Sequence, residues 1–127
     1  MKNRPSPALP DLVTDQRGQP RYLCSALVTL HWQTGRERHK ATVLLENISA
    51  FGACLQAEFG LPGGARVRMA CGRQSFRGVV RYCLLTVGGW FIGLELDADS
   101  RWSKTKYLPE HLLDPRKVQA RNKPRVM

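Results

Sequence analysis

Apolar and polar side chains alternate along residues 22–32. A repeat of two places successive side chains on opposite faces, which is typical of a strand with one face in a protein core. Ser25, Thr29 and His31 fall on the polar face. The other face carries Tyr22, Cys24, Ala26, Val28, Leu30 and Trp32. The pattern therefore predicts a half-buried strand at this point of the chain.

Five further short segments carry a strand signal and are separated by turn sequences rich in glycine. They cover residues 39–48, 53–58, 66–70, 76–85 and 90–96. In the longest of the later segments, one face is expected to carry Phe76, Gly78, Val80, Tyr82 and Leu84. Six short strands predict an all-β fold. A closed six-stranded antiparallel β-barrel is favoured because closure removes the exposed edges of a sheet.

The segments on either side of these strands differ from them in character. Residues 1–16 are proline-rich without apolar periodicity and predict a flexible N-terminal arm, so the barrel domain is expected over residues 17–98. Residues 99–114 are expected to form a short helical extension, with Asp99 or Ser100 as a cap and Pro109 starting another turn. Residues 115–127 contain no acidic residue and predict a basic, disordered tail.

The formal net charge is +10, from 20 Lys and Arg residues against 10 Asp and Glu residues. This charge favours anionic partners such as nucleotides, nucleic acid or acidic surfaces. Between Glu58 and Glu95 the chain has no acidic residue but contains Arg66, Arg68, Arg73, Arg77 and Arg81. A run of one charge is equally typical of a solvated surface, so the charge by itself identifies no site.

The sequence offers little for metal binding, catalysis or membrane insertion. His31, His39 and His111 are far apart, and no apolar run approaches the roughly 18 residues that span a membrane. Paired catalytic carboxylates, a phosphate-binding loop and a nucleophile elbow are not evident. We therefore expect a cytoplasmic protein that is not an enzyme and has no catalytic residues, metal site or cofactor. Without zinc-type spacing, small core residues are the expected role of Cys24, Cys54, Cys71 and Cys83.

Two short motifs lie beside the first three predicted strands. Residues 17–21 form an R-x-x-x-R loop directly before the first strand, and residues 47–52 form an N-x-S-x-x-G turn between the second and third strands. In this order and setting, the motifs resemble those of the bacterial PilZ domain family. The loop at residues 61–64 and the last strand are also similar to the family. The resemblance covers residues 17–98.

This resemblance implies a split β-barrel that binds the second messenger cyclic di-GMP and signals by conformational change to a downstream protein, which the sequence does not identify. The ligand contacts that it implies are Arg17, Arg21, Asn47, Ser49 and Gly52.

The chemistry of these residues suits the ligand. A guanidinium group forks onto phosphate, stacks on a purine, or donates twice to guanine O6 and N7. The amide of Asn47 can both donate and accept at a guanine edge, and the hydroxyl of Ser49 can donate to phosphate. We expect Gly52 to adopt a positive φ, with its amide facing the ligand.

Two other functions remain open from the sequence. A PilZ-like barrel that binds no nucleotide can act as a protein-interaction adaptor, although an adaptor does not need both arginines of the loop. A basic barrel can also bind single-stranded nucleic acid. The sequence disfavours nucleic acid because exposed aromatic residues interleaved with basic ones are not evident.

Overall fold

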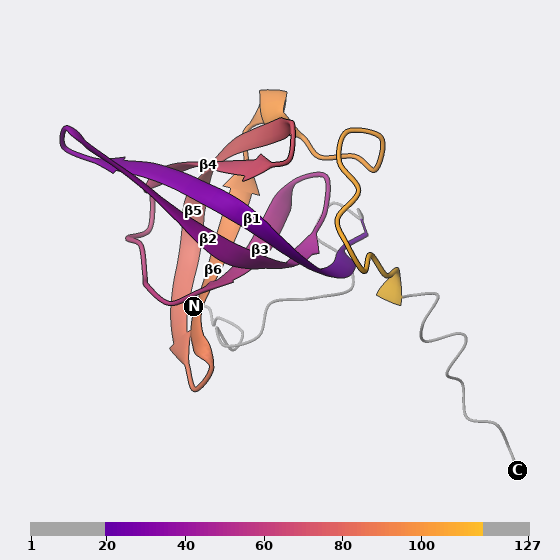
Figure 1. The fold of residues 1–127 in the computed structure, drawn as a ribbon, viewed down its shortest axis with the longest axis horizontal. Helices are drawn as coiled ribbons and strands as arrows, with labels where there is room; N and C mark the ends of the chain where they lie inside the picture. The colour runs from indigo at the N-terminus through magenta and orange to yellow at the C-terminus, as the bar shows by residue number, and fades with distance from the viewer. Residues whose placement is uncertain (1–19, 116–127) are drawn as a thin grey trace, which may run out of the picture.

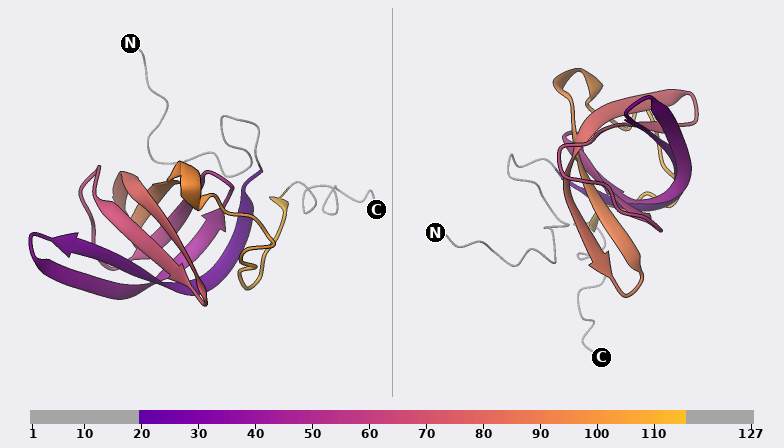
Figure 2. Two further views of the ribbon diagram at one scale, coloured as in Figure 1. Left: turned by 90° about the horizontal axis from the view of Figure 1, so that it is seen from above. Right: turned by 90° about the vertical axis from the view of Figure 1, so that its left-hand side faces the viewer.

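The computed structural model describes residues 20–115. The elements in chain order are β1 (Tyr22–Thr34), β2 (Glu37–Ile48), β3 (Gly52–Ala57), β4 (Arg66–Cys71), β5 (Gln74–Thr86), β6 (Gly89–Leu96) and the 3-10 helix η1 (Ala98–Ser100). The strands pair in the order β1-β2-β3-β6-β5-β4, and β4 pairs back onto β1. Every pairing is antiparallel, so the predicted closed six-stranded barrel is confirmed (Figures 1 and 2).

Each predicted strand is present, and its ends differ from the predicted ones by at most two residues. The inner face predicted for β1 is buried, since Ala26, Val28 and Leu30 are at most 4% exposed. Burial of these side chains is the main force holding the sheet closed. The largest fully buried side chains are Phe76, Leu30, Leu45, Ile48, Leu55, Met69, Ile92 and Leu96. Cys54 and Cys71 are also buried, as expected for small core residues.

The β1–β2 hairpin extends beyond the rest of the barrel. β1 pairs with β2 as far as Thr34, whereas β4 pairs with β1 between Thr29 and Trp32. The tip of the hairpin therefore projects from the barrel, as Figure 1 shows at its upper left. The opposite end of the same two strands lies near the predicted ligand-binding motifs.

The C-terminal segment differs from the helical extension that the sequence predicted. η1 is three residues long, and residues 101–114 contain turns but no helix. Asp97 precedes η1 without a side-chain cap, while the Ser100 Oγ accepts a hydrogen bond from the Arg77 amide at 3.0 Å. Burial of Trp102 in the core explains the difference, because its indole Nε1 donates to the Tyr107 carbonyl at 2.8 Å and holds the chain in a loop.

The same segment then returns to the start of β1. Leu23 and Leu113 exchange two backbone hydrogen bonds of 2.8 and 2.7 Å, and the Ser25 amide donates to the Glu110 carbonyl at 3.1 Å. These bonds satisfy backbone groups that a helix would otherwise have paired internally. Within residues 20–115, no helix is long and apolar enough to cross a membrane. The predicted arm at residues 1–16 and the tail from residue 116 onward lie outside the described residues.

Candidate functional site

The two sequence motifs meet through one side-chain hydrogen bond. Arg21 lies directly before β1, and Asn47 is the second-last residue of β2. The Arg21 Nη1 donates to the Asn47 Oδ1 at 2.9 Å, and Asn47 is 3% exposed. Arg21 therefore folds back over the end of β2. The pair closes a contact across 26 positions of sequence.

A second donor of Arg21 has no partner. The Arg21 Nε is buried and forms no hydrogen bond to any group in residues 20–115. A guanidinium group carries five N–H donors and no acceptor, and an unpaired buried donor costs about 1–3 kcal/mol. A bound anion that accepts a hydrogen bond from this Nε would explain why the donor is left unpaired within the protein.

The turn between β2 and β3 is held by its own backbone and by Ser49. The Ser49 amide donates to the Gly52 carbonyl at 2.8 Å, and the Ser49 Oγ accepts from the Phe51 amide at 3.2 Å. Serine favours such turns because its short side chain reaches a backbone amide two residues on. Ser49 is fully buried, so in this structure its hydroxyl stabilises the turn.

The expectation of a positive φ at Gly52 is wrong. Among residues 20–115, the glycines with positive φ are Gly35, Gly64, Gly72 and Gly89. Gly52 is required for a different reason, namely its close approach to β6. A Cβ at this position would lie 2.7 Å from the Leu94 carbonyl oxygen and 3.8 Å from the Arg21 Nη2. The missing side chain thus lets β3 pair closely with β6 and leaves room for the arginine.

Two further residues join this cluster, and sequence reasoning did not identify them. Asn47 pairs across the sheet with Cys54, Cys54 pairs with Gly93, and Tyr82 also pairs with Gly93. The Tyr82 hydroxyl donates to the Cys54 Sγ at 3.9 Å. The ring of Tyr82 covers Gly93, where a Cβ would lie 2.2 Å from its Cε2. Arg21, Asn47, Cys54 and Tyr82 therefore form one polar cluster across β2, β3, β6 and β5.

This cluster combines one cation, Arg21, with neutral groups, and the carboxylate of Glu46 on β2 also acts on Cys54. Burial raises the pKa of the Cys54 thiol and of the Tyr82 hydroxyl, so both stay protonated at neutral pH. The positive charge of Arg21 acts on both groups in the opposite direction and lowers each pKa, which places it close to them. The guanidinium group of Arg21 suits an anionic group, and the neutral neighbours supply additional hydrogen-bonding partners.

The place of Tyr82 depends on an irregularity in β5. The pairing of β5 with β6 shifts between Val80 and Tyr82, so the alternation predicted for this strand does not continue through it. Cys83, rather than Tyr82, packs against the core beyond the shift. The amino-acid pattern of the strand carries no signal for this bulge, because the predicted inner face from Phe76 to Leu84 is continuous in sequence.

The remaining candidates lie elsewhere. Arg17, the first arginine of the loop motif, lies outside the described residues. Trp32 stacks between His39 and Phe59, with ring centroids 5.3 and 4.9 Å away, and Trp102 belongs to the core. Trp32 and Trp102 therefore do not form a common surface for stacking bases. In the part of the chain that the structure describes, no three His, Cys, Asp or Glu residues gather as a metal site would require.

No model of a known protein family matches this chain, and no curated protein is similar to it.

Proposed function

We propose that this chain is a bacterial, cytoplasmic receptor for cyclic di-GMP, with a PilZ-like split barrel. The observation that carries the proposal is the hydrogen bond between Arg21 and Asn47, because it joins the two motifs that resemble the PilZ family. The buried, unpaired Nε of Arg21 supports the same conclusion, since it leaves a charged donor at the meeting point.

In this proposal, Arg21 and Arg17 bind the nucleotide together. One guanidinium group forks onto a phosphate or onto guanine O6 and N7, and the other stacks on a purine face. Asn47 offers its amide to a guanine edge once Arg21 releases it. Gly52 keeps the surface low enough for the ligand to approach, because a Cβ would occupy space 3.8 Å from the arginine.

Ligand binding requires a change of conformation. Asn47 and Ser49 are both almost completely buried, so a phosphate reaches the Ser49 hydroxyl only when the residues covering it move. Arg21 is one such residue, and its exchange of Asn47 for a ligand acceptor displaces the chain just before β1. This displacement is the signal that we propose is passed to a downstream protein.

Calorimetric titration with cyclic di-GMP tests the proposal. We expect selective binding in the micromolar range or tighter, which is about 8 kcal/mol or more, with no comparable heat from GTP or a short RNA. Arg21→Ala should abolish most of this binding, and Arg73→Ala provides the matched control because Arg73 lies in the exposed turn between β4 and β5. A folded protein that gives no heat with high micromolar cyclic di-GMP rules the receptor out.

One observation favours a second candidate, the nucleotide-independent adaptor. Arg21 already has a protein partner without ligand, and a purely structural arginine would also hold the buried Asn47. The same titration separates the two functions. If Arg21→Ala lowers the melting temperature and the wild-type protein binds no nucleotide, the arginine is structural and the adaptor is the better description.

A further inference from the structure

A row of basic side chains crosses four strands of the barrel, at a distance along β1 from the Arg21 cluster. His31 on β1 pairs directly with Lys40 on β2 and with Arg68 on β4, and Arg68 pairs directly with Arg77 on β5. Neighbouring strands lie about 4.8 Å apart, so these four residues, the basic row, span about 15 Å. Met69 and Val67, the neighbours of Arg68 on β4, are buried in the core, so Arg68 and the residues paired with it lie on the outer face of the sheet.

This arrangement is unfavourable for the protein alone. Like charges directly opposite each other on neighbouring strands destabilise a sheet. Within residues 20–115, Arg68 and Lys40 form no ion pair, although both are exposed. Desolvation, followed by the charges of Arg68 and Lys40, lowers the pKa of His31 between them. Lys40 and Arg68 thus carry positive charges that no carboxylate within residues 20–115 compensates.

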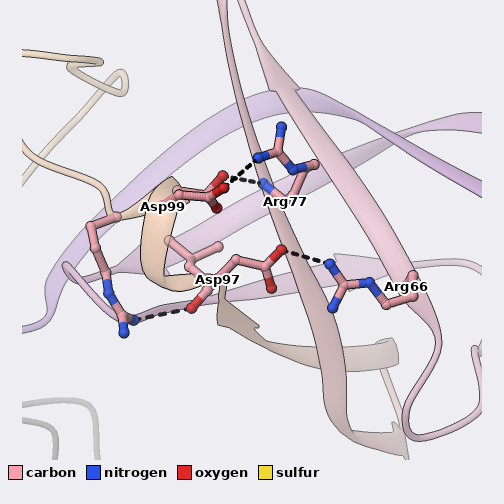
Figure 3. A network of polar contacts seen from close by, with 7 residues as sticks. Arg66, Arg77, Asp97 and Asp99 are labelled. Atoms are coloured by element: carbon pink, nitrogen blue, oxygen red, sulfur yellow. Dashed lines mark hydrogen bonds and ion pairs between the residues drawn. The ribbon is translucent and has the colours of Figure 1, made fainter.

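The chain itself shows what compensates this charge. Asp97 lies directly before η1 and Asp99 lies on it, and their carboxylates reach back to Arg66, beside the row, and to Arg77, its last member (Figure 3). The Asp97 carboxylate accepts from Arg66 at 2.6 Å, and the Asp99 carboxylate accepts from Arg77 at 2.9 Å. Two carboxylates separated by one residue therefore already pair with two arginines of this surface, while Arg68 and Lys40 stay open.

The surface beside the row is hollow. A cavity of about 620 Å³ opens between the projecting β1–β2 hairpin and strands β4 and β5. Every charged residue that lines it is basic or histidine, namely His31, Arg38, His39, Arg66, Arg68 and Arg77. Trp32 also lines it, but its ring is stacked between His39 and Phe59. The hollow thus offers cations and little free aromatic surface.

We propose that the basic row and this hollow form a docking surface for an acidic segment of a partner protein. The segment carries carboxylates at alternate positions, as Asp97-Ala98-Asp99 does, and pairs with Lys40, Arg68 and Arg38. Nucleic acid is the less favoured occupant, because single strands bind through exposed aromatic rings. The large exposed apolar side chains of the described residues include no aromatic one. This surface is independent of the proposed receptor function, and its test contains no cyclic di-GMP.

Fluorescence anisotropy with the full-length protein tests the surface. The probe is a short fluorescein-labelled peptide with glutamate at alternate positions and serine between them, at low salt. We expect Arg68→Glu and Lys40→Glu each to weaken its binding by about tenfold or more, equal to about 1.4 kcal/mol. The control Arg73→Glu makes the same charge change in the β4–β5 turn, outside the row, and should weaken binding by less than about threefold.

The melting temperatures and the relative losses of peptide affinity show whether the basic row binds an acidic segment. Because Lys40 and Arg68 lie on different strands and are exposed, at least one variant is expected to melt as the wild-type protein does. Equal losses in Arg68→Glu and Arg73→Glu show diffuse attraction and overturn the proposal, as does a peptide that fails to bind at low salt. An oligothymidylate that binds more tightly through the same residues assigns the surface to nucleic acid instead.

The titration of His31 gives a second, local readout. Lys40 faces it from β2 and Arg68 faces it from β4, and both charges hold its pKa down. A carboxylate docked on the row opposes these charges, so saturating peptide should raise the pKa of His31, measured by the proton chemical shifts of its ring. Peptide bound elsewhere leaves this pKa unchanged, which would count against docking on the row.

Discussion

Replacing Gly52 by alanine tests whether close strand pairing, rather than backbone conformation, demands glycine at the candidate site. The new Cβ would lie 2.7 Å from the Leu94 carbonyl oxygen, which is fixed in the β3–β6 pairing. Carbon and oxygen cannot approach so closely, so the two strands must separate locally. Overpacking of this kind costs about 1–3 kcal/mol, and the reduced freedom of the unfolded chain returns about 0.4–1 kcal/mol.

The expected net loss is about 1–2 kcal/mol, which corresponds to a fall in melting temperature of about 5–10 °C for a domain of this size. Gly63→Ala is the matched control. Nothing lies within 4 Å of a Cβ at Gly63, and its φ is not positive. The control should therefore melt at or slightly above the wild-type temperature.

Thermal unfolding followed by circular dichroism measures both variants, with cyclic di-GMP titration of each folded protein. Gly52→Val should lose more stability than Gly52→Ala because two further methyl groups enter the same space. If Gly52→Ala melts together with Gly63→Ala, the contact with Leu94 relaxes at no cost and the steric account of Gly52 is incorrect.

Three other changes have defined outcomes. Arg21→Ala should weaken cyclic di-GMP binding by about ten- to a hundredfold in calorimetry, because it removes charge-assisted hydrogen bonds. Deleting residues 116–127 should leave nucleotide affinity within about threefold in calorimetry, because none of the proposed ligand contacts belongs to this segment and the loss of its charges weakens only long-range attraction; outright loss of binding would place the tail in the site. Burial raises the pKa of Cys71 to about 12 from 9.0, so the unfolded thiol loses its proton first as pH rises. The contribution of Cys71 to the free energy of unfolding, measured with denaturant, should be complete below pH 9 and fall by about 1 kcal/mol per pH unit above it. Cys71→Ala should make this fall with pH less steep.

The strands could be predicted because the core imposes its period on the sequence. Ala26, Val28 and Leu30 alternate with polar residues for the same reason that they are buried, namely that one face of β1 lines the barrel. The turns between the strands could also be predicted, because glycine-rich turn sequences are local in the chain. Closure into a barrel was predicted from the need to pair every strand edge, whereas the strand order β1-β2-β3-β6-β5-β4 was not predicted.

The candidate site was predictable in part. The motifs supplied Arg21 and Asn47, but their hydrogen bond joins positions 26 residues apart and depends on the path of the chain before β1. The reason for Gly52 lies in Leu94, on another strand, and the place of Tyr82 depends on a bulge that leaves no pattern. The prediction of a helical extension at residues 99–114 was wrong because the burial of Trp102 outweighs the weak local preference for helix.

The pairing of Leu23 with Leu113 makes the two ends of the described chain mechanically dependent on each other. Both hydrogen bonds of this pair lie two residues beyond Arg21, and they hold the last turn of the C-terminal segment against the start of β1. A shift of β1 at this point breaks both bonds together, since they share the same two residues. If ligand binding displaces the backbone at Arg21, as proposed above, the same movement acts on the hydrogen bonds that hold residues 110–113 against β1.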